Sequence, residues 1–161
     1  MRKLEVMSTN TLPAALAEIV DDFQALTEPD RLQLLLEFSR GLPELPERLK
    51  DHPELLEQVV ECQSPLFLTI ESEKNKDDAE GPRAYRLFFK APPEAPTTRG
   101  FAGVLHEGLD GLTAQEILDV PDDMPELLGL TRAITPLRMR GMTAMLGRIK
   151  RKVAAASRLE H

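Results

Sequence analysis

The chain contains a single cysteine, Cys62, and a sulfur nucleophile is the clearest chemistry that it offers. One cysteine cannot form an internal disulfide, nor can it supply the several thiolates that hold an iron–sulfur cluster. Gln63 and Ser64 follow it, and Pro65 restricts the backbone, which predicts a turn at the entry to a strand. A cysteine in such a turn can be presented to a partner. A lone cysteine is also often a small buried apolar residue, so both interpretations stay open on spacing alone.

The other side chains that could do acid–base or metal chemistry lack the necessary spacing. His106-Glu107 has no second histidine one helical turn away, as a zinc-binding helix would need. His52 lies beside a proline in a predicted loop, and the paired acids Asp21-Asp22 lie on a polar helix face. The sequence has no glycine-rich phosphate loop. We therefore expect no cofactor and no metal site.

The charges are distributed unevenly along the chain. Residues 136–158 contain seven basic side chains and no acidic one, whereas residues 1–135 carry thirteen basic against twenty-six acidic side chains. An acidic domain of this kind repels nucleic acid, so we expect no nucleic-acid partner. The basic segment could meet an acidic protein surface, although neutralisation of its own domain is the simpler interpretation.

Length and composition fit one globular domain, which we expect to comprise residues 1–158. Residues 159–161 resemble the start of a vector-encoded tag and are excluded from the fold prediction. The sequence has no run of about eighteen apolar residues, and no apolar signal-peptide core follows its basic first residues. We expect a cytoplasmic protein with no membrane contact, in agreement with its single cysteine.

Apolar positions three and four residues apart predict helices on both sides of the middle of the chain. We expect them at residues 12–26, 27–41, 99–109, 113–118, 127–128 and from 135 onward. Thr113 and Glu116 have capping-box spacing, and Thr135-Pro136 is a helix start signal. Helices therefore enclose the central segment.

The central segment changes to a period of two. Residues 66–71 and 85–90 alternate in this way and predict two strands, joined by the polar loop 72–82, and Val59 and Val60 predict a short third strand. Strands with no crossover helix between them pair antiparallel. We therefore expect an α+β fold, with a small antiparallel three-stranded sheet and helices packed on one face.

Five short motifs, in order over residues 11–155, resemble those of the SufE family of sulfur acceptors. Cys62-Gln63-Ser64 resembles the Gly-Cys-Gln-Ser motif of the family. The other motifs are Arg99-Gly100 at a helix start, the capping turn at residues 109–117, the step at residues 127–130 and the closing helix at residues 134–145. Glu61 departs from the pattern, because the family usually has Gly before the cysteine.

The resemblance implies a fold of the SufE/IscU type and a role in sulfur transfer. Cys62 would take the terminal sulfur of a persulfide on a SufS-like cysteine desulfurase and stimulate that enzyme. It would then pass the sulfur on for iron–sulfur cluster assembly, with a scaffold complex as a further partner. Arg138 and Arg99 would support the thiolate or grip the partner, beside Gln63 and Ser64.

The resemblance also implies an apolar pocket that shelters the cysteine, for which Val60, Leu66 and Phe67 are the expected lining. The main alternative is an adaptor that activates a desulfurase by binding, without carrying sulfur. A thiol peroxidase would instead need a resolving cysteine or a dedicated acid–base partner, and the sequence offers neither.

Overall fold

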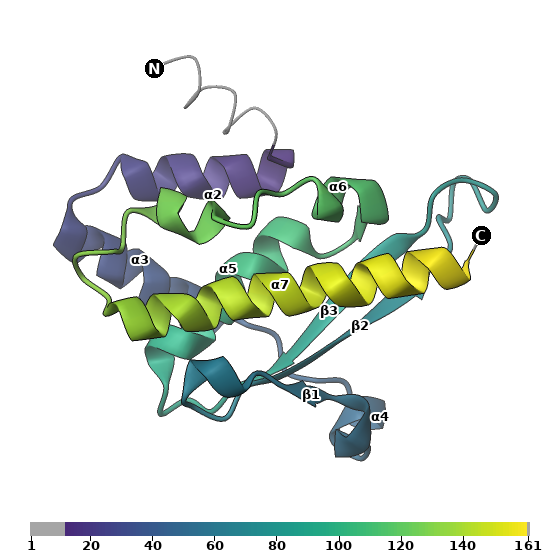
Figure 1. Ribbon diagram of the computed structural model, residues 1–161, viewed down its shortest axis with the longest axis horizontal. Helices are drawn as coiled ribbons and strands as arrows, with labels where there is room; N and C mark the ends of the chain where they lie inside the picture. Colours follow the sequence, from purple (N-terminus) through teal and green to yellow (C-terminus); the bar gives the residue numbers. More distant parts are fainter. Residues whose placement is uncertain (1–11, 161) are drawn as a thin grey trace.

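The computed structural model describes residues 12–160, so the first eleven residues of the predicted domain and residue 161 lie outside the described residues. Helices precede the sheet in the chain, and further helices follow it (Figure 1). The elements before the sheet hairpin are α2 (Ala14–Gln24), α3 (Glu28–Gly41), α4 (Glu47–Lys50), η1 (Pro53–Leu55), β1 (Glu57–Gln58) and η2 (Val60–Cys62). Those that follow are β2 (Phe67–Glu73), β3 (Ala84–Lys90), α5 (Pro96–Leu109), β4 (Leu112–Thr113), α6 (Ala114–Leu118), η3 (Met124–Leu128) and α7 (Pro136–Leu159). The predicted α+β class is confirmed.

The sheet has four antiparallel strands in the order β1-β2-β3-β4, not the three that we predicted. The extra strand, β4, pairs with the start of β3, and its two residues are too short for any period to show in the sequence. The first strand is Glu57–Gln58, immediately before the Val59-Val60 pair in which we expected it.

Alternation along β3 separates the two faces of the sheet. Tyr85, Leu87 and Phe89 are buried, whereas Arg86 and Lys90 are exposed. Helices α5 and α7 contact β3 and β2 respectively, and they cover the buried face (Figure 1). The helices α2 and α3 pack on α5 rather than on the sheet. Helix α5 also contacts α7, and α7 contacts η2, where the cysteine lies. The packing of the helices therefore fixes the position of α7 against the cysteine turn.

The long helix α7 begins at the predicted signal. The Thr135 side chain accepts a hydrogen bond from the Arg138 N–H at 3.3 Å, and Pro136 occupies the first turn. Its buried stripe consists of Met139, Met142, Met145, Leu146, Ile149 and Val153. Leu137, an apolar residue in the first turn of α7, lies outside this stripe and is 44% exposed. Within residues 12–160, no helix is long and apolar enough to cross a membrane.

The end of α7 is fixed to the β2–β3 hairpin. The Glu160 carboxylate pairs with Arg83 at 2.7 Å and accepts hydrogen bonds from the hydroxyls of Tyr85 and Ser72. The interpretation of residues 159–161 as a tag remnant stays a prediction.

Candidate functional site

Cys62 lies in a tight turn between β1 and β2. The residues Val60–Cys62 form a 3-10 turn, and Gln63 follows with a φ of 60°, in the left-handed region. The Val59 N–H donates to the Leu66 carbonyl at 2.8 Å and closes the base of the turn. A residue other than glycine in this region costs about 1–2 kcal/mol, so contacts from elsewhere must hold the turn in place.

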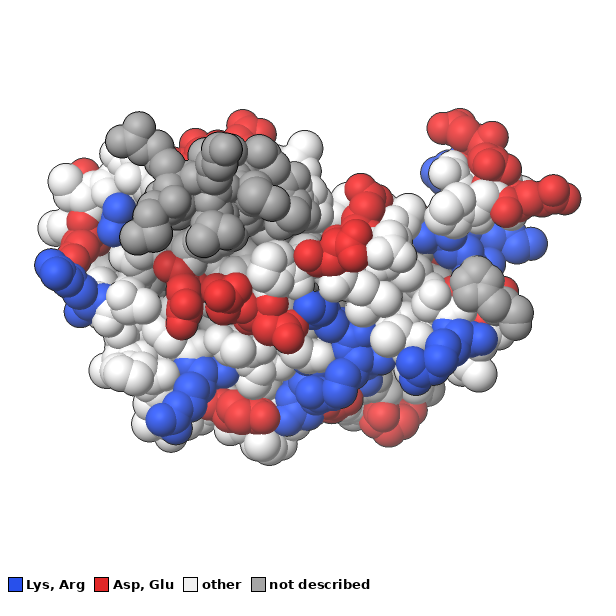
Figure 2. Space-filling model, turned by 45° about the horizontal axis from the view of Figure 1, so that its top comes forward, with Lys and Arg blue, Asp and Glu red and all other residues white. Residues whose placement is uncertain are grey.

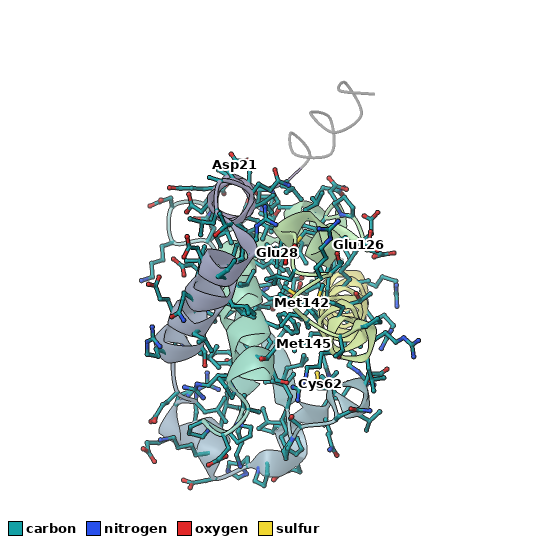
Figure 3. The ribbon with its side chains drawn as sticks, turned by 90° about the vertical axis from the view of Figure 1, so that its left-hand side faces the viewer. Asp21, Glu28, Cys62, Glu126, Met142 and Met145 are labelled. Carbon is teal, nitrogen blue, oxygen red and sulfur yellow. The ribbon has the colours of Figure 1, made fainter. Side chains whose placement is uncertain are left out.

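The thiol points inward, against α7. Cys62 is 4% exposed, and its Sγ lies 3.6 Å from the Gly141 carbonyl oxygen. A methyl group on Gly141 would lie 3.1 Å from both the Sγ and the Cα of Cys62, closer than ordinary van der Waals contact. Figure 3 shows Cys62 beneath α7, with Met142 and Met145 pointing into the interior beside that helix. The lack of a side chain at Gly141 thus makes room for the cysteine.

Charged side chains surround the turn on its solvent side. Arg148 of α7 pairs with Glu57 of β1, and its Nη2 donates to Glu61 Oε1 at 2.7 Å. Lys152 also pairs with Glu57, at 2.9 Å. These cations lower the pKa values of both carboxyl groups, Glu57 mainly through Lys152 and Glu61 mainly through Arg148.

Burial raises the pKa of the Cys62 thiol from its ordinary value of 9.0 to about 12. The negative charge of Glu61 adds to this rise, and the positive charge of Arg148 opposes it. A thiol with this pKa is almost wholly protonated at neutral pH and is therefore a poor nucleophile. The Cys62 thiol is thus both buried and protonated. We therefore expect it to react only after the turn moves.

Comparison with known proteins identifies the family of the chain. The family model described as SufE, Fe-S metabolism associated domain, matches residues 17–153. The chain belongs to the SufE family. An uncharacterized SufE-like protein of Mycobacterium tuberculosis is 52% identical over 146 residues, which are 91% of this chain and 96% of that protein. A SufE-like protein of Synechocystis is 30% identical over 151 residues, 93% of this chain and 87% of that protein.

A solved structure has the same architecture. The solution structure of a hypothetical protein from Thermus thermophilus matches this SufE protein with a TM-score of 0.73 and 37% identity. The match covers 90% of this chain and 97% of the other. The SufE family is linked to iron–sulfur metabolism, which agrees with the resemblance found in the sequence.

The four supporting residues predicted for this SufE protein do not all lie at the sulfur. Gln63 is exposed and Ser64 is half-buried, both in the turn itself. Arg138 is exposed in the first turn of α7. The guanidinium of Arg99 donates to three main-chain carbonyls, those of Ala91 at 2.7 Å, Ser39 at 2.9 Å and Leu42 at 3.3 Å. The cation that acts on the pKa of Cys62 is neither of these arginines but Arg148.

Two residues of the site were therefore missed from the sequence, Gly141 and Arg148. They are seven residues apart, so they lie two turns apart on one side of α7. The seven-residue spacing can be read from the sequence, but it indicates a shared site only once Gly141 is known to face Cys62. Within residues 12–160, no group of three or more His, Cys, Asp or Glu is arranged to hold a metal ion.

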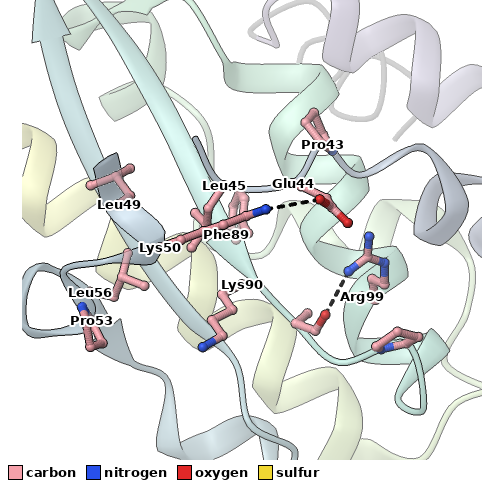
Figure 4. Close-up of a pocket in the computed structure, with 12 residues that line it drawn as sticks. Pro43, Glu44, Leu45, Leu49, Lys50, Pro53, Leu56, Phe89, Lys90 and Arg99 are labelled. Carbon is pink, nitrogen blue, oxygen red and sulfur yellow. Dashed lines mark hydrogen bonds and ion pairs between the residues drawn. The ribbon is translucent and has the colours of Figure 1, made fainter. Parts of the chain in front are cut away.

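The expected apolar pocket differs from the cavities that are present. A cavity of about 420 Å³ lies between residues 43–56, the end of β3 and Arg99 (Figure 4). Its lining includes Leu45, Leu49 and Phe89, but not the three residues that we expected. Leu66 is buried in the core and Phe67 is half-buried, whereas Val60 is 65% exposed. The Cys62 thiol packs directly on α7, with its Sγ 3.6 Å from the Gly141 carbonyl oxygen.

The reactivity of Cys62 should rise steeply with pH. At pH 8, a pKa of about 12 leaves a thiolate fraction of about 10⁻⁴, roughly 1000-fold below that of an unperturbed thiol. We expect the rate of alkylation by iodoacetamide to rise about tenfold per pH unit from pH 7 to 10 in the folded protein. In urea, the same rate should level off near pH 9.

The same shift makes stability depend on pH. The folded-state pKa is raised, so the fold favours the protonated thiol, and this stabilisation is fully present below about pH 9 and is lost as the pH rises toward about 12. Urea unfolding at a series of pH values measures the loss. The alkylation experiment gives the contradicting outcome. If the rate in the folded protein levels off near pH 9, as it should in urea, the thiol is not held closed and protonated.

Replacement of Arg99 by Met should destabilise the protein without changing the thiol. Its three charge-assisted hydrogen bonds join the end of α3 to the segment after β3, and their loss should cost about 2–4 kcal/mol. Urea unfolding measures this loss. Arg132→Met is the matched control, because the Arg132 side chain is 86% exposed, and it should change stability by less than about 0.5 kcal/mol.

Proposed function

We propose that this SufE protein is a sulfur acceptor and carrier that works with a cysteine desulfurase of the SufS kind. The observation that carries the proposal is the single thiol of the chain, placed in a turn at the family's Cys-Gln-Ser motif. A sulfur carrier needs one nucleophilic sulfur that can be both hidden and presented. A closed turn with a protonated thiol supplies the hidden state.

The transfer is a thiol–disulfide exchange. The Cys62 thiolate attacks the terminal sulfur of the desulfurase persulfide, and the new bond forms between these two sulfur atoms. The sulfur–sulfur bond of the donor breaks, and its electron pair leaves with the desulfurase cysteine as a thiolate. Cys62 then carries the persulfide. One sulfur–sulfur bond replaces another, so the step needs no external oxidant or reductant.

The surface around the turn supports a protein partner. Val60, two residues before the cysteine, is 65% exposed, and Leu137 is 44% exposed at the start of α7. Figure 2 shows Lys and Arg side chains grouped along α7, with acidic side chains beside them. Exposed apolar residues near exposed cations favour a partner with an acidic rim, and we propose that Arg138 contacts it.

After the transfer, we propose that the sulfur passes to an iron–sulfur scaffold complex in the cytoplasm. The acidic character of residues 1–135 argues against nucleic acid as a partner. We propose no cofactor for this chain, since the persulfide resides on a side chain of the protein itself.

An adaptor function is the second candidate, and the raised pKa of Cys62 favours it. An adaptor would stimulate the desulfurase by binding and would not need the thiol. The test is to mix the protein with a pyridoxal-loaded cysteine desulfurase and cysteine, and to measure the intact mass and the turnover. A carrier gains the mass of one sulfur atom on Cys62. Faster turnover with no added mass would establish the adaptor instead.

A further inference from the structure

One side of α7 faces both ends of the cysteine turn. Gly141 and Arg148 are seven residues apart, about two helical turns, and therefore lie on the same side of the helix. Gly141 contacts Cys62, whereas Arg148 contacts Glu57 before the turn and Glu61 within it. The helix thus holds the turn at the sulfur and again about 10 Å further along its axis.

The contact between Arg148 and Glu61 is the one that can break when the turn moves. The Arg148 side chain is 16% exposed and stays packed, whereas that of Glu61 is 45% exposed and can swing into solvent. Glu57 belongs to β1 and is held independently by Lys152. Opening the turn therefore separates Glu61 from Arg148 and leaves the pairs of Glu57 in place.

The turn has little that stabilises it apart from α7. Only the hydrogen bond at its base is short, 2.8 Å from the Val59 N–H to Leu66, whereas those within the turn are long, 3.2 Å from the Cys62 N–H to Val59 and 3.4 Å from the Gln63 N–H to Val60. Gln63 has a positive φ. Among the described residues, the Nε of Arg148 is buried and has no hydrogen-bond partner, so the closed state leaves one polar group unsatisfied. The closed and open states are therefore close enough in free energy for one ion pair to shift their balance.

We infer that Arg148 is a positioning residue, which through Glu61 holds Cys62 against Gly141 until a partner displaces this contact. The biological meaning of the inference rests on the proposed function, since it describes how the sulfur carrier is kept closed when alone. Its physical content is independent of that function, because it concerns only the exposure of the thiol. Glu61, the departure from the family motif, has a role in this arrangement.

Replacement of Arg148 distinguishes two effects on the reactivity of Cys62, that of the position of the turn and that of the charge near the thiol. The positive charge of Arg148 lowers the pKa of Cys62, so its loss would by charge alone make the thiol less reactive. Loss of its grip on Glu61 would instead open the turn and make the thiol more reactive. The two effects have opposite signs in Arg148→Met, whereas both accelerate the reaction in Glu61→Gln.

The experiment measures alkylation of Cys62 by iodoacetamide at pH 8 in the protein alone. We expect Arg148→Met and Glu61→Gln each to react about two- to fivefold faster than wild type, the change expected from loss of one partly exposed ion pair. Potassium chloride should accelerate the wild type more than Arg148→Met, in which only the charge of Glu61 is left to screen, and it should not accelerate Glu61→Gln. Arg158→Met is the matched control. It removes one positive charge from an exposed position near the end of α7, and it should react like wild type.

An Arg148→Met protein that folds, by circular dichroism, and reacts at or below the wild-type rate overturns the inference. If that variant does not fold, Glu61→Gln provides the test. An alkylation rate of Cys62 in Glu61→Gln that still rises with salt also overturns the inference. Sulfur uptake separates the two proposals. Wild type that takes up sulfur while Arg148→Met alkylates slowly leaves the carrier function standing without the positioning role. If Arg148→Met is alkylated fast but wild type takes up no sulfur, the positioning role of Arg148 stands and the carrier function fails.

Discussion

Cys62→Ser is expected to reduce sulfur uptake from a cysteine desulfurase to the level of a sample without this protein. A serine hydroxyl stays protonated at neutral pH and is a far weaker nucleophile than a thiolate toward sulfur. The substitution keeps the shape of the side chain at a slightly smaller size, and the hydroxyl faces the same Gly141 carbonyl as the thiol. We therefore expect the fold to survive, with a stability change of about 1 kcal/mol. Intact mass spectrometry of both proteins after incubation measures the effect.

The turnover of the desulfurase adds a second measurement to this experiment. If the protein is a carrier, Cys62→Ser should bind the enzyme and fail to accelerate it through sulfur removal. Cys62→Ala should behave in the same way, which shows that the result does not depend on the hydroxyl. Full stimulation by Cys62→Ser would contradict the carrier and support the adaptor.

Gly141→Ala is expected to expose Cys62 and to accelerate its alkylation by about 10- to 100-fold. The added methyl would lie 3.1 Å from the Sγ and from the Cα of Cys62, so the turn must move away from α7. Overpacking of this kind costs about 1–3 kcal/mol, and here it falls on the closed state of the turn. The alkylation rate at pH 8 reports the opening directly.

Gly147→Ala provides the matched control on the same helix. The nearest atom to a methyl there is Nη1 of Arg151, at 3.8 Å, so nothing must move. Ala is favoured over Gly inside a helix by about 0.5–1 kcal/mol, and this variant should be more stable than wild type by that amount. Its Cys62 should react at the wild-type rate. Equal alkylation rates in the two variants would show that Gly141 does not hold the turn closed.

The local features of the fold were predictable because they depend on residues close in sequence. The Thr113–Glu116 capping box is present, with the side chains and main-chain N–H groups of both residues paired as expected. The start of α7 at Thr135-Pro136 and the turn after Cys62 also follow from neighbouring residues. A helix cap or a turn involves contacts within a few positions, which sequence spacing records directly.

The strands show where this local information ends. β2 and β3 were predicted because each is seven residues long and carries apolar side chains at a period of two, which in β3 matches an alternating burial. β4 has two residues, and it exists because β3 offers its free edge at Ala84 and Tyr85. Its presence depends on where the chain returns after α5, and no pattern within two residues can record that.

The sequence by itself determined that Cys62 is the reactive candidate, that it follows a strand-like segment in a turn, and that the chain resembles SufE proteins. Only the tertiary structure decided the state of the thiol. Gly141 is 79 residues from Cys62, and Arg148 is 87 residues from Glu61, yet these contacts bury the sulfur and raise its pKa. Burial and ion pairing depend on distances in space, and packing of α7 on the turn sets those distances rather than any spacing along the chain.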